Sequence, residues 1–91
     1  MTLAAGLIRL NLRAGDRVRV GDVLLTFQGK AEGVATFEVQ APSGLKTHLM
    51  VAHERAALPG QATFLVEKRS GKSARIALSA PASLAIQRLP A

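Results

Sequence analysis

Arginine and lysine are the residues of this sequence with the clearest potential for chemistry, because they outnumber the acidic side chains. The 91-residue chain has 12 Lys and Arg against 6 Asp and Glu, which gives a net charge of +6. Two arginines, Arg13 and Arg88, stand near opposite ends of the chain. A guanidinium group can bind phosphate, contact the O6/N7 edge of guanine and stack on bases. The charge balance therefore favours a polyanionic partner, either nucleic acid or an anionic surface.

Patterns that would indicate catalysis or metal binding are missing from the sequence. His48 and His53, with Glu54, fit neither an HExxH helix nor a zinc-finger spacing. The six carboxylates are scattered and mostly occupy turns, where Asp commonly hydrogen-bonds to its own backbone. The chain has no cysteine, which excludes disulfides and cysteine metal sites. We expect no enzyme, no cofactor, no metal and no small-molecule substrate.

The elements that must position the arginines are predicted to be β-strands. Apolar and polar residues alternate, as in half-buried antiparallel strands, over 7–13, 17–20, 35–40 and 74–78. Further strands are predicted over 23–27, 45–51, 62–67 and 84–89, and polar hairpin loops over 28–33 and 68–72. Only 52–58 could hold a helical turn, which Pro59 and Gly60 would end.

Composition predicts a single small all-β domain spanning residues 1–91. The chain is 48% hydrophobic but only 3% aromatic, so Val, Leu, Ile, Ala and three Phe must form the core. A chain of this length buries only about 60–65% of its unfolded surface, which makes a homodimer possible. No apolar run approaches the roughly 20 residues that cross a membrane, and no signal-peptide pattern is present. We expect a soluble cytoplasmic protein with no membrane partner.

The second half of the sequence repeats the pattern of the first. A shift of 39 places residues 21–49 on residues 60–88 without a gap, with five identities among 29 pairs. The identical pairs are Gly21/Gly60, Ala35/Ala74, Ala41/Ala80, Pro42/Pro81 and Leu45/Leu84. This pattern predicts two tandem repeats, one over about 7–49 and the other over about 50–91.

Short motifs occur in an order that resembles the carbon storage regulator family (CsrA, also called RsmA). Arg13-Ala14-Gly15-Asp16 is followed, after four intervening residues, by Gly21-Asp22 and a β-rich run. Near the other end, a strand over 74–78 precedes Ala80-Pro81, and a last strand contains Ala85-Ile86-Gln87-Arg88. The opening is also similar to that of the flagellar regulator FlbT, a second relative.

The resemblance implies an RNA-binding translational regulator that recognises GGA-type motifs in a messenger RNA leader or a small RNA. It implies a small antiparallel β-barrel or sandwich in which two CsrA-like repeats form an intertwined pseudo-dimer. In this family an RNA site joins the first strand of one subunit to the last strand of the other. The positions that correspond to its RNA-binding residues are Leu10, Asn11, Arg13, Gln87, Arg88 and His48.

Two departures from the family pattern leave another class of function open. Leu12 stands where the family has a basic residue, and Leu49 stands where the first repeat would have its last-strand arginine. The chain could therefore be a structural or protein-interaction β module, of flagellar or phage assembly, that kept the fold and lost specific RNA binding. The last strand of repeat one would also run into the expected first strand of repeat two, at 49–53. We therefore predict one intact site, with Arg13 and Arg88, and one degenerate site.

Overall fold

The structure is a computed structural model that describes residues 7–59, 61–70, 73–81 and 85–89. The described part is all-β and contains nine strands and no helix. The strands are β1 (Leu7–Arg13), β2 (Arg17–Val20), β3 (Val23–Ala31), β4 (Val34–Ala41), β5 (Gly44–Met50), β6 (Arg55–Leu58), β7 (Ala62–Ser70), β8 (Ser73–Ser79) and β9 (Ile86–Leu89). The predicted fold class, a small antiparallel β-barrel or sandwich, is confirmed.

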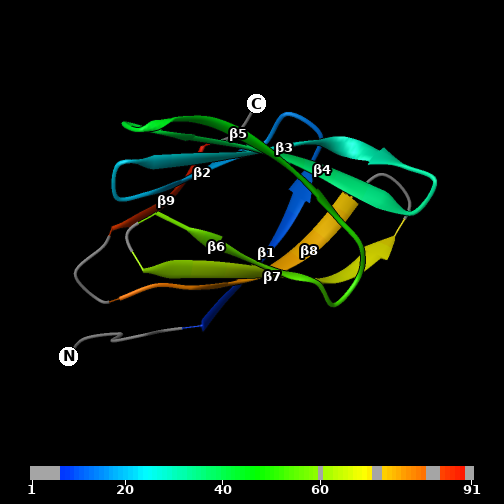
Figure 1. Ribbon diagram of the computed structural model, residues 1–91. Helices are drawn as coiled ribbons and strands as arrows, with labels where there is room; N and C mark the ends of the chain where they lie inside the picture. The colour runs from blue at the N-terminus through cyan, green and yellow to red at the C-terminus, as the bar shows by residue number, and fades with distance from the viewer. Residues whose placement is uncertain (1–6, 60, 71–72, 82–84, 90–91) are drawn as a thin grey trace.

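The strands form two antiparallel sheets that face each other (Figure 1). One sheet has the order β1-β8-β7-β6, and the other has the order β5-β4-β3-β2-β9. The first strand of the chain thus lies in the sheet built by the second half, beside β8. The last strand lies in the sheet built by the first half, beside β2. This exchange of the outermost strands intertwines the two halves of the chain.

The core lies between the two sheets and consists of the inward residues of the alternating strands. All three phenylalanines are fully buried, as expected. The ring of Phe37 is centred 5.2 Å from that of Phe27 in the same sheet and 5.0 Å from that of Phe64 in the facing sheet. Leu12 of β1 is also fully buried, because it points inward while its neighbours Asn11 and Arg13 point outward. Burying one such side chain contributes about 1.5–3 kcal/mol to folding.

Both predicted hairpin loops are shorter than expected. β3 continues to Ala31 and β4 begins at Val34, so only Glu32 and Gly33 form the turn, with φ of 53° and 80°. Positive φ at both turn residues matches the twist of the two strands, which extends the ladder through the polar residues. In the second hairpin, β7 likewise continues to Ser70 and β8 begins at Ser73.

The segment 52–58 forms no helical turn. Instead β6 pairs with β7, because the N–H of Val66 donates to the backbone oxygen of Glu54 and starts a ladder there. β5 ends at Met50, so the separate strand predicted over 49–53 does not form either. Pairing with a neighbouring strand outweighs the weak local preference of this segment for a turn.

Strand pairing is the same in two stretches of the chain. The β3–β4 hairpin and the β7–β8 hairpin have the same register at a shift of 39, and the irregularity after Phe27 recurs after Val66. The turn after β1 and the turn after β5 have the same hydrogen bonds at a shift of 38, since the side chain of Asp16 accepts from Arg13 N and that of Glu54 from Val51 N. The tandem-repeat interpretation stays a prediction, and its Gly60 and Leu84 lie outside the described residues.

Candidate nucleic-acid interface

An open hollow of about 580 Å³ lies where the end of β1, the turn after it, the start of β8 and β9 meet. Its lining consists of polar and charged side chains, namely Asn11, Arg13, Asp16, Ser73 and Arg88. These residues come from both ends of the chain, and the exchange of the outermost strands is what brings them together. A wide polar hollow with two arginines suits an anionic or hydrogen-bonding ligand.

Alternation along β1 determines which of its residues reach the hollow. Asn11 and Arg13 are exposed, whereas Leu12 between them is buried in the core. Antiparallel pairing sets Asn11 opposite Arg75 and Arg13 opposite Ser73. Since side chains of directly paired residues lie on the same face, the outer surface of β1 continues onto β8.

Asp16 connects the two arginine-bearing strands. It follows Gly15, whose φ of 96° closes the turn. Its Oδ2 accepts a hydrogen bond from the backbone N–H of Arg13 at 3.0 Å and another from Nη2 of Arg88 at 2.9 Å. The side chain of Asp16 is only 12% exposed, and that of Arg88 is 45% exposed. Asp16 therefore orients the guanidinium of Arg88 while that group stays accessible to a ligand.

Two more cations contact residues that line the hollow. Nε of Arg75 donates to Oδ1 of Asn11 at 3.1 Å, which orients the Asn11 amide. Nζ of Lys30 donates to the backbone oxygen of Ser73 at 3.4 Å. Neither cation is among the site residues predicted from the sequence, because Arg75 reaches Asn11 through the pairing of β1 with β8, and Lys30 reaches Ser73 through a contact between the two sheets. The repeated alternation over 74–78 was the only sequence signal that placed Arg75 on an outer face.

Three of the six predicted site residues come together in the hollow, and three lie elsewhere. Asn11, Arg13 and Arg88 line it. Leu10 is on the same strand as Asn11 and Arg13, but its side chain packs against the core and does not line the hollow. Gln87 is exposed and pairs with Arg19, while Arg88 pairs with buried Val18, so the two neighbours point to opposite faces of the sheet.

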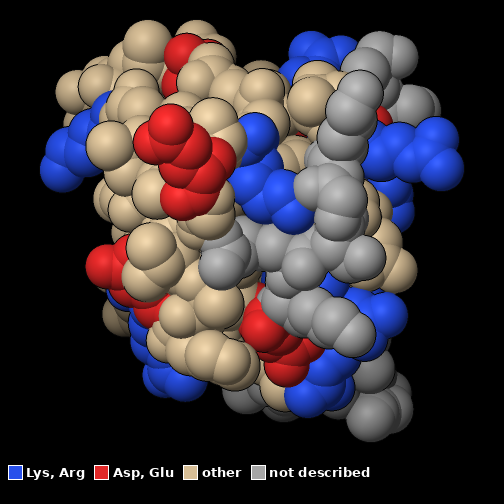
Figure 2. Space-filling view, turned by 90° about the vertical axis from the view of Figure 1, so that its right-hand side faces the viewer, with Lys and Arg blue, Asp and Glu red and all other residues tan. Residues whose placement is uncertain are grey.

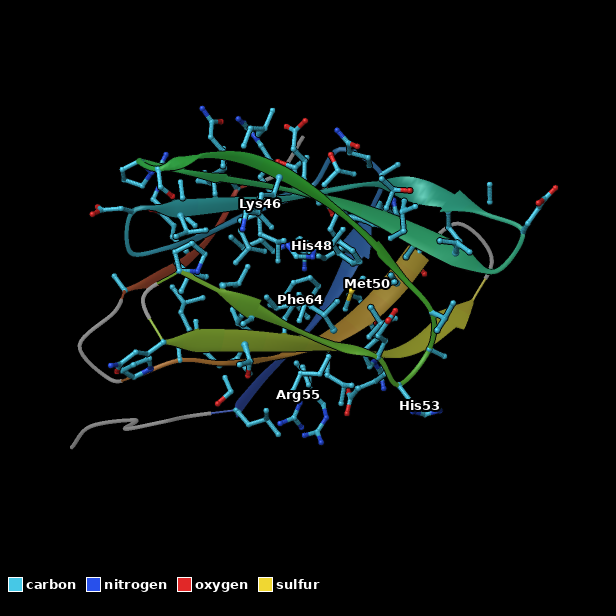
Figure 3. All side chains as sticks on the ribbon, viewed as in Figure 1. Lys46, His48, Met50, His53, Arg55 and Phe64 are labelled. Atoms are coloured by element: carbon cyan, nitrogen blue, oxygen red, sulfur yellow. The ribbon has the colours of Figure 1, made fainter. Side chains whose placement is uncertain are left out.

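His48 lies far from the hollow. It belongs to β5, which forms the edge of the five-stranded sheet opposite to β9. Figure 3 shows His48 pointing between the sheets towards Phe64. The two rings are 6.3 Å apart in an edge-on arrangement. His48, which the sequence assigns to the degenerate site of repeat one, is therefore separated from Arg13 and Arg88, because its strand lies at the other edge of the sheet.

Charge on the rest of the surface is mixed. On the face seen in Figure 2, basic side chains occur at several places with acidic side chains between them. In the part of the chain that the structure describes, no group of three or more His, Asp and Glu side chains is placed to hold a metal ion. The described residues also include no helix long and apolar enough to cross a membrane.

Comparison of the chain with models of known protein families, with curated proteins and with solved structures gives no match.

Proposed function

We propose that the hollow between β1 and β9 binds single-stranded RNA, and that the protein acts as a post-transcriptional regulator recognising GGA-type motifs. The observation that carries this proposal is the meeting of Arg13 and Arg88 in one polar hollow, although they lie 75 positions apart. A net charge of +6 supports it, because phosphate contacts supply much of the affinity for nucleic acid. The preference for GGA is inferred from the resemblance of the sequence motifs to those of the carbon storage regulator family.

The mode of recognition follows from the side chains present. All three aromatic side chains are buried, so bases cannot stack on them. Arginine planes and the Asn11 amide take that part instead, since a guanidinium can stack on a base or bind guanine O6 and N7 in a bidentate manner. Asp16 reduces the entropy that Arg88 would lose on binding, because it already holds one side of the fork.

We infer one such site for each chain, among the described residues. At the position that corresponds to Asn11 and Arg13 by the shift of 38, β5 and the turn after it carry Leu49 and Val51. Both side chains are exposed, at 66% and 48%. Neither can bind phosphate. The chain should therefore bind one GGA motif at a time rather than bridge two.

A competition experiment tests the proposal. An RNA hairpin with a GGA loop competes with the same hairpin carrying CCA, at about physiological salt, for the wild type and for Arg88→Ala. We expect a preference for GGA that Arg88→Ala lowers by roughly 5- to 150-fold, the range of 1–3 kcal/mol for one bidentate base contact. Lys46→Ala is the matched control, because it removes one exposed positive charge from the opposite edge of the same sheet.

Equal and weak binding of both hairpins, with the same loss for Arg88→Ala and Lys46→Ala, would contradict specific recognition. It would leave only generic attraction between a basic protein and RNA. Two equivalent RNA sites in one monomeric chain would contradict the single-site arrangement.

A second candidate function is protein interaction, in a structural or assembly role. The exposed apolar side chains of Leu45, Leu49 and Val51 favour it, because they are 59%, 66% and 48% exposed. Clusters of exposed apolar side chains often mark protein contacts. Failure of the GGA competition together with a saturable protein partner on β5 would favour this function over RNA binding.

A further inference from the structure

The outer edges of β2 and β6 occupy corresponding positions in the two sheets. β2 pairs with β3 through Val18–Leu25 and Val20–Val23, and β6 pairs with β7 through Ala56–Phe64 and Leu58–Ala62. The registers coincide when β2 is shifted by 38 and β3 by 39. The strand that covers the outer edge of β2 therefore indicates what kind of strand could pair with the outer edge of β6.

On β2, the outer edge is covered by β9. Ile86 lies opposite Val20 and packs against the core, and Arg88 lies opposite Val18 and donates to Asp16. The N–H of Gly21 donates to the backbone oxygen of Ala85 at 3.0 Å. The strand at this edge thus carries an apolar residue, which packs against the core, and two positions later a basic residue, which pairs with the buried carboxylate of Asp16.

On β6, no strand among the described residues pairs with the outer edge. A hollow of about 320 Å³ opens there between β6 and β5. Its walls include Val39, Ala41 and Leu58, with Lys46 and His48 on the β5 side (Figure 3). Leu58 corresponds to Val20, so this hollow lies where Ile86 would lie if a strand like β9 were present.

The carboxylate at this edge also corresponds. Glu54 takes the place of Asp16 and accepts a hydrogen bond from Val51 N at 3.0 Å, just as Asp16 accepts one from Arg13 N. Glu54 is exposed, and among the described residues no basic side chain forms an ion pair with it. The surface beside it carries exposed Leu49 and Val51, which suits a peptide partner and not a phosphate backbone.

We propose that β6 accepts an extended peptide strand from a protein partner, added antiparallel at its outer edge with the side-chain pattern of β9. The partner strand places an apolar residue opposite Leu58, in the 320 Å³ hollow, and a Lys or Arg two residues later beside Glu54. Its backbone completes the β6 edge as β9 completes β2, which is strand addition to an exposed sheet edge. The proposal does not depend on RNA binding by the hollow at β1 and β9.

The test uses the full chain, labelled with ¹⁵N, and a synthetic peptide with the sequence of residues 84–90. We expect saturable amide shifts confined to β5 and β6 at up to roughly millimolar peptide. In an antiparallel strand, the backbone N–H and C=O groups of successive residues point alternately to the two edges. The backbone oxygen of Glu54 accepts from Val66 N on β7, so the N–H of Ala57, three residues later, points to the outer edge. Ala57→Pro removes this N–H and should therefore abolish the shifts. Proline is tolerated on such an edge, and Ala57→Ser is the control that keeps the donor.

A second pair of measurements tests the ion pair separately. Glu54→Gln should lower the affinity for the peptide about two- to fivefold, the range that a partly exposed ion pair contributes. It should not weaken a peptide in which the arginine is replaced by glutamine. This comparison stays informative even if Ala57→Pro does not fold.

Three results would overturn the proposal. The first is no saturable binding of the peptide. The second is binding with shifts at β2 and β9 that persists in folded Ala57→Pro, because the peptide would then exchange with the chain's own last strand. The third is a peptide-independent dimer that Ala57→Pro dissociates, which would make a second copy of this chain the occupant of the edge.

Discussion

Nη2 of Arg88 lies 2.9 Å from Oδ2 of Asp16, so that an ion pair joins two residues 72 positions apart. Asp16 belongs to the turn after β1, and Arg88 belongs to the last strand. The same carboxylate oxygen accepts from the backbone of Arg13. One buried acidic group thus fixes the relative positions of both arginines that line the candidate RNA site, and it also holds β9 onto the sheet.

Asp16→Asn separates the two effects that this carboxylate has on RNA. Asparagine keeps an acceptor for Arg13 N but removes the charge that holds Arg88. We expect tighter binding to any single-stranded RNA, because net positive charge rises, and a smaller ratio between GGA and CCA hairpins, because Arg88 is less well oriented. The free energy of unfolding should fall by about 1 kcal/mol, since the pair is partly exposed to solvent.

Glu67→Gln is the control for Asp16→Asn. It removes the same charge from a second ion pair, in which Oε1 of Glu67 lies 3.0 Å from Nε of Arg9, away from the lining of the hollow. It should raise generic RNA affinity in the same way and leave the GGA ratio unchanged. An equal loss of selectivity in both variants, measured by the competition experiment, would mean that Asp16 does not orient Arg88 for recognition.

Arg9 and Arg13 should contribute differently to the salt dependence of RNA binding, although they share one face of β1. Arg13 lines the hollow, whereas Arg9 is paired with Glu67. Arg13→Ala should reduce the slope of log affinity against log salt concentration by about 0.7, the value for one phosphate contact on a single strand. Arg9→Ala should change the slope less. Equal changes in the two titrations would show that the RNA does not lie in the hollow.

Local alternation was sufficient to predict most of the strands, because the side-chain period of two is a property of each segment by itself. The outward position of Arg13 and the burial of the three phenylalanines followed in the same way. The pairing of strands could not be obtained from such patterns. Pairing depends on which strand edges lie next to each other in the fold. The segment of β6 alternates only weakly, and it forms a strand because it pairs with β7.

The same distinction explains the candidate site. Arg13 and Arg88 were grouped through the order of motifs along the chain, and the structure places both in one hollow. Arg75 and Asp16 were missed because their roles arise from contacts across strands that only the register reveals. His48 belongs to the site of repeat one that the sequence predicts to be degenerate, and it lies apart from the hollow because it is on β5, whereas the strand that reaches the hollow is β9.

Glu32→Asn should stabilise the protein. Glu32 has φ of 53° in the two-residue turn between β3 and β4, a region that costs an ordinary side chain about 1 kcal/mol and that Asn adopts more readily. We expect the free energy of unfolding to rise by about 0.5–1 kcal/mol in urea titrations. Glu32→Gln removes the same charge without the conformational gain and should not stabilise. Equal stabilisation by both would assign the effect to charge and not to the turn.

Phe37→Leu should destabilise the protein by about 1–3 kcal/mol, because the ring of Phe37 contacts rings of both sheets and its loss leaves space in the core. Leucine is the better choice than alanine, since truncation to alanine costs about 3–5 kcal/mol and could unfold a domain of this size. Leu45→Ala is the control, because Leu45 is 59% exposed and such positions change stability by less than about 0.5 kcal/mol. Urea unfolding of both variants, repeated at two protein concentrations, measures the difference. A large, concentration-dependent cost for Leu45→Ala would show that the exposed face of β5 is covered by a second copy in solution.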